Sequence, residues 1–177
     1  ALADGSTPAL ERVRRVAIQA ARALAHAHQH GVLHRDIKLG NLLIGKDDEA
    51  MLIDFGLAKS AADRDLTRVG RTMGTFSYLA PEYVKAADAG ENPKHTVATD
   101  LWAFGCLLYA FTCRAPAFRN KDEIRLLRLV ARAQFTPVKA RAPDVPDDWA
   151  TLIHQLMEPD PARRLPTAAQ LVARLES

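Results

Sequence analysis

His34-Arg35-Asp36-Ile37-Lys38-Leu39-Gly40-Asn41 is the stretch that decides the fold, and Leu52-Ile53-Asp54-Phe55-Gly56 follows it after one short connection. Together the two segments supply carboxylates, an amide and a lysine. A carboxylate can accept a hydroxyl proton, an amide and a second carboxylate can hold Mg²⁺, and a lysine can neutralise phosphate. A His-Arg-Asp triplet alone would be a common coincidence, but its combination with the second segment indicates phosphoryl-transfer chemistry.

The connection between these segments predicts a β-hairpin, and the residues before them predict a helix. Leu42-Leu43-Ile44 and Ala50-Met51-Leu52-Ile53 are short apolar runs on either side of the polar residues 45–49. From Thr7-Pro8 to Gly31, small and branched apolar residues recur at helical spacing. The helix would lead the chain to the first loop, and the hairpin would join that loop to the second.

Helices dominate the rest of the expected fold. Residues 101–113 are apolar around the whole circumference of a helix, which is typical of a helix surrounded by protein. Cys106 and Cys113 would lie about 10 Å apart on this helix, too far for a disulfide, so free thiols are expected. Three later helices are expected, with start signals at Asn120 with Glu123, Asp147-Asp148, and Thr167 with Gln170.

The composition limits the class of protein and its expected partners. The chain has 177 residues, 48% of them hydrophobic and 25% charged, which is ordinary for one soluble domain. Its formal net charge of +3 comes from interleaved acidic and basic residues, so nucleic acid is not an expected partner. Because no apolar run would span a membrane and no secretion signal is evident, we expect a soluble, cytoplasmic (intracellular) protein.

These segments resemble the catalytic loop and the metal loop of the eukaryotic-type serine/threonine protein kinases. Gly74-Thr75-Phe76-Ser77-Tyr78-Leu79-Ala80-Pro81-Glu82 is similar to the end of the family's activation segment. Asp100-Leu101-Trp102-Ala103-Phe104-Gly105 and Asp160-Pro161-Ala162-Arg163-Arg164 are similar to two later family motifs. Because the matches extend along nearly the whole chain, the resemblance does not depend on any one of them.

The resemblance implies a protein kinase-like carboxyl-terminal lobe, mainly α-helical, with a small β-hairpin carrying the catalytic and metal loops. Residues 1–177 would form a partial kinase domain, with the catalytic loop at 34–41, the metal loop at 54–56 and the activation segment at 54–82. No glycine-rich phosphate loop or strand lysine precedes His34. We therefore expect the carboxyl-terminal lobe alone, inactive in isolation.

The resemblance also implies roles for individual residues. Asp36 would accept the substrate hydroxyl proton, and Lys38 would counter charge on the transferred phosphoryl group. Asn41 and Asp54 would hold Mg²⁺, and Leu43 would lie beneath the adenine ring of ATP. In the family, a lysine at the position of Lys38 is typical of serine/threonine kinases, so protein substrates with Ser or Thr hydroxyls are expected.

Further residues are expected to support the site by resemblance. Asp100 would orient the backbone of the catalytic loop, although capping a helix is the simpler interpretation of this carboxylate and is compatible with that role. Thr75 would contact Asp36 and Lys38. The other expected contacts are Arg164 with Glu82 and His34 with Phe55.

Regulation is expected on residues 57–73, which are polar and basic without a period and predict a mobile surface segment. In kinases that resemble this chain, an arginine at the position of Arg35 meets a phosphate on the activation segment. Thr72 is the first candidate for that phosphate and Thr67 the second, placed by an upstream kinase or by autophosphorylation.

Other interpretations of the same sequence remain open. A non-catalytic binding or scaffold module could keep the kinase shape. A small-molecule phosphotransferase would fit the two loops but not Ala80-Pro81-Glu82. The spacing of His26, His28 and His30 suggests metal, but no cysteine or carboxylate lies at ligand spacing, so solvated or helix-end histidines are expected.

Overall fold

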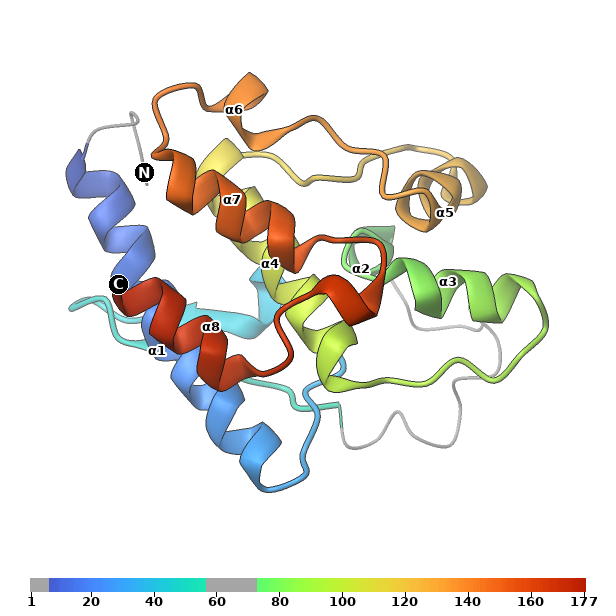
Figure 1. Cartoon of the computed structure of the whole chain (residues 1–177), viewed down its shortest axis with the longest axis horizontal. Helices are drawn as coiled ribbons and strands as arrows, with labels where there is room; N and C mark the ends of the chain where they lie inside the picture. The colour runs from blue at the N-terminus through green and yellow to red at the C-terminus, as the bar shows by residue number, and fades with distance from the viewer. Residues whose placement is uncertain (1–6, 57–72) are drawn as a thin grey trace.

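Helices make up most of the fold, together with one small hairpin, in the computed structural model, which describes residues 7–56 and 73–177 (Figure 1). In chain order the elements are α1 (Thr7–Gln29), the 3₁₀ turn η1 (Leu39–Asn41), β1 (Leu42–Ile44), β2 (Ala50–Leu52), α2 (Met73–Phe76), α3 (Pro81–Asp88), α4 (Val97–Cys113), α5 (Glu123–Ala131), α6 (Val138–Arg141), α7 (Asp147–Leu156), the 3₁₀ turn η3 (Pro161–Arg163) and α8 (Ala168–Glu176). The expected phosphosites Thr67 and Thr72 lie outside the described residues, as does nearly all of the segment predicted to be mobile.

The hairpin confirms the prediction made from its two apolar runs. β1 and β2 pair antiparallel, with Leu42 opposite Leu52 and Leu43 opposite Met51. Because successive strand residues point to opposite faces, Leu42 and Leu52 are buried, while Leu43 and Met51 are 52% and 62% exposed. The hairpin therefore presents an apolar outer face next to the catalytic loop.

α1 carries the hairpin on its flank. Its apolar face packs against β2 and α8. At the tip of the hairpin, the Asp48 carboxylate accepts hydrogen bonds from Arg12 and Arg15, and Gln19 donates to the Asp48 backbone oxygen at 2.9 Å. These bonds attach the tip of the hairpin to α1. The hairpin that joins the two loops is therefore held at its tip by the helix.

α4 is the buried centre of the fold, as the apolar run predicts. Every residue from 101 to 110 is buried, and Figure 1 shows the helix crossing the middle of the molecule behind α7. Thr96 caps it through a reciprocal pair of hydrogen bonds with Thr99. Cys106 and Cys113 are free thiols, as expected.

The later helices confirm the expected elements, with one correction. α5 begins at Glu123 and its capping residue is Asp122, which accepts from the Arg125 amide; the prediction that Asn120 opens this helix was wrong. Asn120 instead accepts from the Asp122 amide at 2.9 Å, which makes a short turn before the helix. Thr167 caps α8 by accepting from the Gln170 amide.

Candidate active site

The catalytic loop brings three of the expected side chains together. Lys38 Nζ lies 2.9 Å from Asp36 Oδ2, and Asn41 Nδ2 lies 3.0 Å from the same oxygen. Asn41 Nδ2 also donates to the Asp36 backbone oxygen at 2.8 Å. Since the Asp36 side chain is only 9% exposed, these donors hold the carboxylate in one orientation.

Asp100 supports the backbone of that loop from below. Its Oδ2 accepts from the His34 amide at 2.8 Å, and its Oδ1 accepts from the Arg35 amide at 2.9 Å. Arg35 has a φ of 64°, in the left-handed region that non-glycine residues seldom adopt, so the loop needs this support. The orienting role expected for Asp100 is confirmed, whereas the capping alternative is wrong because Thr96 caps α4.

His28 is a supporting residue that the sequence did not indicate. Its Nε2 lies 2.8 Å from Asp100 Oδ2, and its side chain is 7% exposed, so of the two expected settings, solvent or a helix end, only the helix end applies to His28. His28 does lie in the last turn of α1, as expected. The only signal in the sequence was that the long helix ends a few residues before the catalytic loop. That signal does not identify Asp100 as the partner, because Asp100 lies 72 positions away.

The metal loop packs directly on the catalytic loop. The Ile53 amide donates to the Asn41 backbone oxygen at 2.9 Å, and the Gly56 amide donates to the His34 backbone oxygen at 2.8 Å. The rings of His34 and Phe55 lie 4.4 Å apart, which confirms that expected contact. Asp54, between these anchored residues, is exposed, with a φ of 57°.

The ring of His34 is buried, and burial favours its neutral form. Desolvation lowers the pKa of His34, and the nearby negative charge of Asp100 opposes this shift only in part. The neutral ring suits its neighbours, because His34 Nδ1 accepts from the Asp36 amide at 3.3 Å. His34 therefore links the ring of Phe55 to the backbone of Asp36.

The oxygen atoms near the two loops fit a hard cation. Because Asn41 Nδ2 faces Asp36, its Oδ1 is left without a hydrogen bond among the described residues, and Asp54 forms no ion pair there. Mg²⁺ often binds through one or two protein oxygens, with phosphate and water completing its shell. Accordingly, the described residues contain no cluster of three or more His, Cys, Asp or Glu side chains that could hold a metal by itself.

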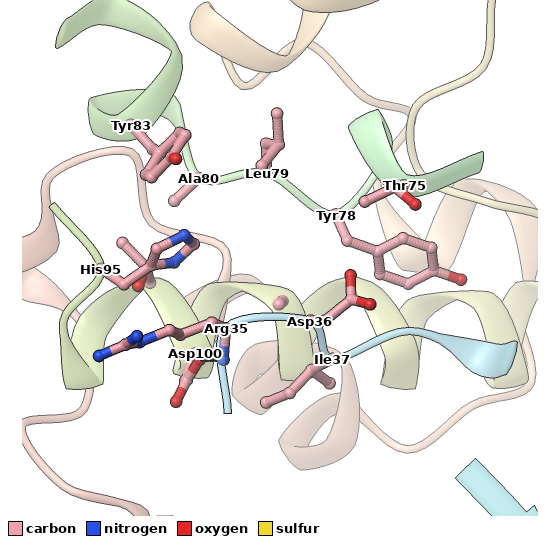
Figure 2. Close-up of a pocket in the computed structure, with 12 residues that line it drawn as sticks. Arg35, Asp36, Ile37, Thr75, Tyr78, Leu79, Ala80, Tyr83, His95 and Asp100 are labelled. Atoms are coloured by element: carbon pink, nitrogen blue, oxygen red, sulfur yellow. Dashed lines mark hydrogen bonds between the residues drawn. The ribbon is translucent and has the colours of Figure 1, made fainter. Parts of the chain in front are cut away.

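A small cavity opens between the catalytic loop and the segment that leads into α3. Figure 2 shows the Asp36 carboxylate pointing from the loop toward Thr75 and Tyr78 on the facing segment. Lys38 Nζ lies 3.4 Å from Thr75 Oγ1, so the expected Thr75 contact is confirmed for Lys38. The cavity has a volume of about 30 Å³ and also borders Leu79. Burial raises the pKa of Tyr78, which also lines the cavity.

An ion pair between the buried Arg164 and the partly exposed Glu82 fixes the far side of the same segment. Both terminal nitrogens of Arg164 lie 2.7 Å from the two carboxylate oxygens of Glu82, in the bidentate geometry. This confirms the expected pair. Because Glu82 lies in the first turn of α3, the ion pair fixes the segment that forms the upper wall of the cavity in Figure 2.

The comparisons with known proteins agree with this geometry. Residues 3–174 match the family model of the protein kinase domain. The chain therefore belongs to the protein kinase family, and its fold is protein kinase-like. The crystal structure of Rad53 1-466 in complex with AMP-PNP superimposes with a TM-score of 0.71 and 25% identity, covering 93% of this chain and 39% of that one.

The curated relatives of this chain are serine/threonine-protein kinases. The serine/threonine-protein kinase PknD of Mycobacterium tuberculosis is 37% identical over 92% of this chain, and PknH of the same species is 34% identical over 89%. RqkA of Deinococcus radiodurans, a DNA damage-responsive serine/threonine-protein kinase, is 34% identical over 96%. The chain spans about a quarter of the length of these relatives. Among the described helices, none has the length and apolarity needed to cross a membrane.

Proposed function

We propose that the protein containing this chain transfers the γ-phosphate of ATP to serine or threonine hydroxyls of protein substrates. One observation carries the proposal: Lys38 and Asn41 both donate to one oxygen of Asp36, beside a cavity bordered by Thr75. Relatives at 34–37% identity bear the name serine/threonine-protein kinase.

Asp36 is the proposed proton acceptor. A substrate hydroxyl in the cavity beside Thr75 would lie within reach of the Asp36 carboxylate, and about 30 Å³ is enough for about one such group. A positioned carboxylate can take the proton as the oxygen attacks phosphorus, because it needs no reorganisation at that moment. Lys38 holds this carboxylate and lies close enough to meet an incoming phosphoryl oxygen.

Asn41 and Asp54 are the proposed Mg²⁺ ligands. When bound, the cation would supply positive charge for the phosphate oxygens as negative charge spreads over them. Asn41 can serve because Asp36 binds its amide nitrogen, which leaves the amide oxygen without a hydrogen bond among the described residues. Leu43, with an exposed apolar side chain on the hairpin, is proposed to lie beneath the adenine ring.

The test is transfer of labelled phosphate by the full-length protein to proteins that contain Ser or Thr, with and without Mg²⁺. Asp36→Asn keeps the size and loses the base, so we expect transfer to fall by about 10²-fold or more, the usual contribution of a general base. Asp88→Asn alters an exposed aspartate at the end of α3 and should leave transfer unchanged.

Two results would contradict the proposal. If the intact protein transfers no phosphate although it is folded, the chain serves instead as a kinase-like binding or scaffold module. If Asp36→Asn and Asp88→Asn have equal activity, Asp36 is not the base.

A further inference from the structure

A second cavity, which we call the distal cavity, lies at the opposite end of α4 from the catalytic loop. Asp100 in the first turn of α4 holds that loop, whereas Cys113 at the last residue lines the distal cavity. The volume is about 420 Å³, within the range of about 300–1,000 Å³ that is typical of small-molecule sites. In Figure 1 the beginning of α1, the end of α4 and the linker from α6 to α7 meet at this end of the molecule.

Much of the wall of the distal cavity is apolar. Leu10 and Val13 come from α1, Phe111 from α4, and Val145 from the linker between α6 and α7. Leu10, Phe111 and Val145 are only partly buried, so each keeps apolar surface that a ligand could cover. Covering such surface is favourable because it removes apolar area from water.

The charged residues of the distal cavity favour an anion. Arg114 and Arg141 both line it, and within the described part of the chain neither forms an ion pair. Asp144 is the one carboxylate among the described lining residues, so cations exceed anions there. The beginning of α1 adds to this, because its first turn carries no acidic residue and a helix amino terminus attracts negative charge.

We propose that the distal cavity binds a small monocarboxylate with an apolar body. The body would lie against Leu10, Phe111 and Val145, and the carboxylate would face the guanidinium groups of Arg114 and Arg141. A planar guanidinium fork matches a carboxylate in geometry as well as charge. The site is separate from the proposed phosphotransfer centre, so its test does not depend on whether the protein transfers phosphate.

Cys113 offers a direct readout of occupancy. It is half-buried in the cavity wall, whereas Cys106 is 2% exposed, and burial raises the pKa of both thiols. The experiment treats the full-length protein with iodoacetamide and follows alkylation of Cys113 by peptide mass spectrometry. The ligand probes are octanoate, 1-octanol and octylammonium, which share one apolar tail and differ in the charge of the head.

We expect octanoate to slow alkylation of Cys113 with saturation, 1-octanol to do so more weakly, and octylammonium to have no effect at the same concentration. Equal protection by octylammonium and octanoate would overturn the proposal, because the arginines would then play no part. Failure of octanoate to protect, or protection that never saturates, would overturn it as well.

Charge variants complete the test. Arg141→Gln and Arg114→Gln should each weaken octanoate binding about ten- to thirtyfold, the lower part of the range for a hydrogen bond to a charged group. Arg132→Gln, which alters an exposed arginine at the end of α5, is the matched control and should not change affinity. The charge of Arg141 also acts on the Cys113 thiol, so protection is measured as a ratio within each variant. Unchanged affinity in both cavity variants would refute the site.

Discussion

The buried side chain of Arg164 connects several segments of the chain through hydrogen bonds. It donates five hydrogen bonds: two to Glu82, and one each to the backbone oxygens of Ala98, Glu158 and Pro159. A guanidinium has five N–H donors, so none is left unused. The group also lies over the ring of Trp102, with 5.0 Å from its central carbon to the ring centroid. The result is a fully desolvated cation whose only charged partner is Glu82 among the described residues.

Because Arg164 is buried, removing its partner should be costly. We expect Glu82→Gln to lower the free energy of unfolding by about 3–5 kcal/mol, since a buried charge would lose its counter-ion. Urea denaturation of the full-length protein measures this. Arg163→Gln is the control: it breaks a 3.7 Å pair with Glu158 in which Arg163 is 71% exposed, and exposed pairs contribute about 0–1 kcal/mol. Equal losses in the two variants would contradict the assignment.

At this scale, the sequence predicts contacts within one loop better than contacts between loops. Asp36, Lys38 and Asn41 belong to one short segment, so their spacing alone restricts how far apart they can lie. The contact between His28 and Asp100 joins residues 72 positions apart, and no pattern in either segment indicated it. The pairing of Arg164 with Glu82, 82 positions apart, was predicted only through the resemblance to kinases.

Among the elements, α6 and α7 meet through a hydrogen bond that depends on pH. The Val138 amide, at the start of α6, donates to His154 Nε2 on α7 at 3.1 Å. Burial lowers the pKa of His154 below its ordinary value of 6.5. Protonation would remove the acceptor and place a charge inside the protein, so the neutral ring is the folded form.

The sign of the pH effect follows from this shift. Since the unfolded chain takes up a proton on His154 more readily than the folded chain, the free energy of unfolding should fall as pH drops from 7.5 through 6.5. His34, whose pKa burial also lowers, acts in the same direction. His154→Gln should flatten the dependence, whereas the exposed His26→Gln should retain it. Urea titrations at several pH values test this, and an unchanged slope in His154→Gln would disprove it.

Element boundaries are predictable where an apolar pattern and a capping residue agree. The apolar run that formed α4 and the Thr167 cap of α8 were identified correctly. The start of α5 was placed at Asn120 because Asn120 and Glu123, three residues later, match the pattern of a capping box. The structure selects Asp122, whose carboxylate reaches the Arg125 amide.

In the whole molecule, α4 is the part on which the site depends. Its first turn supplies Asp100 to the catalytic loop, and its middle packs against α7. Gly105 lies at that packing contact: a Cβ there would come within 2.8 Å of Leu156 Cβ and of Met157 Cγ. The sequence could not predict this contact, because a glycine inside a helix indicates that another element packs closely there but does not indicate which element.

Gly105→Ala therefore sets two effects against each other. Alanine in a helix interior normally stabilises by about 1 kcal/mol relative to glycine, whereas overpacking a core costs about 1–3 kcal/mol. A separation of 2.8 Å is shorter than real Cβ contacts, and one of the facing atoms is Leu156 Cβ, which cannot move without its backbone. We expect overpacking to prevail, with a net loss of unfolding free energy in urea denaturation. Gly40→Ala, where the nearest atom is Lys38 Cε at 3.9 Å, should show no loss. If Gly105→Ala proves as stable as Gly40→Ala, α4 and α7 do not pack as closely as described.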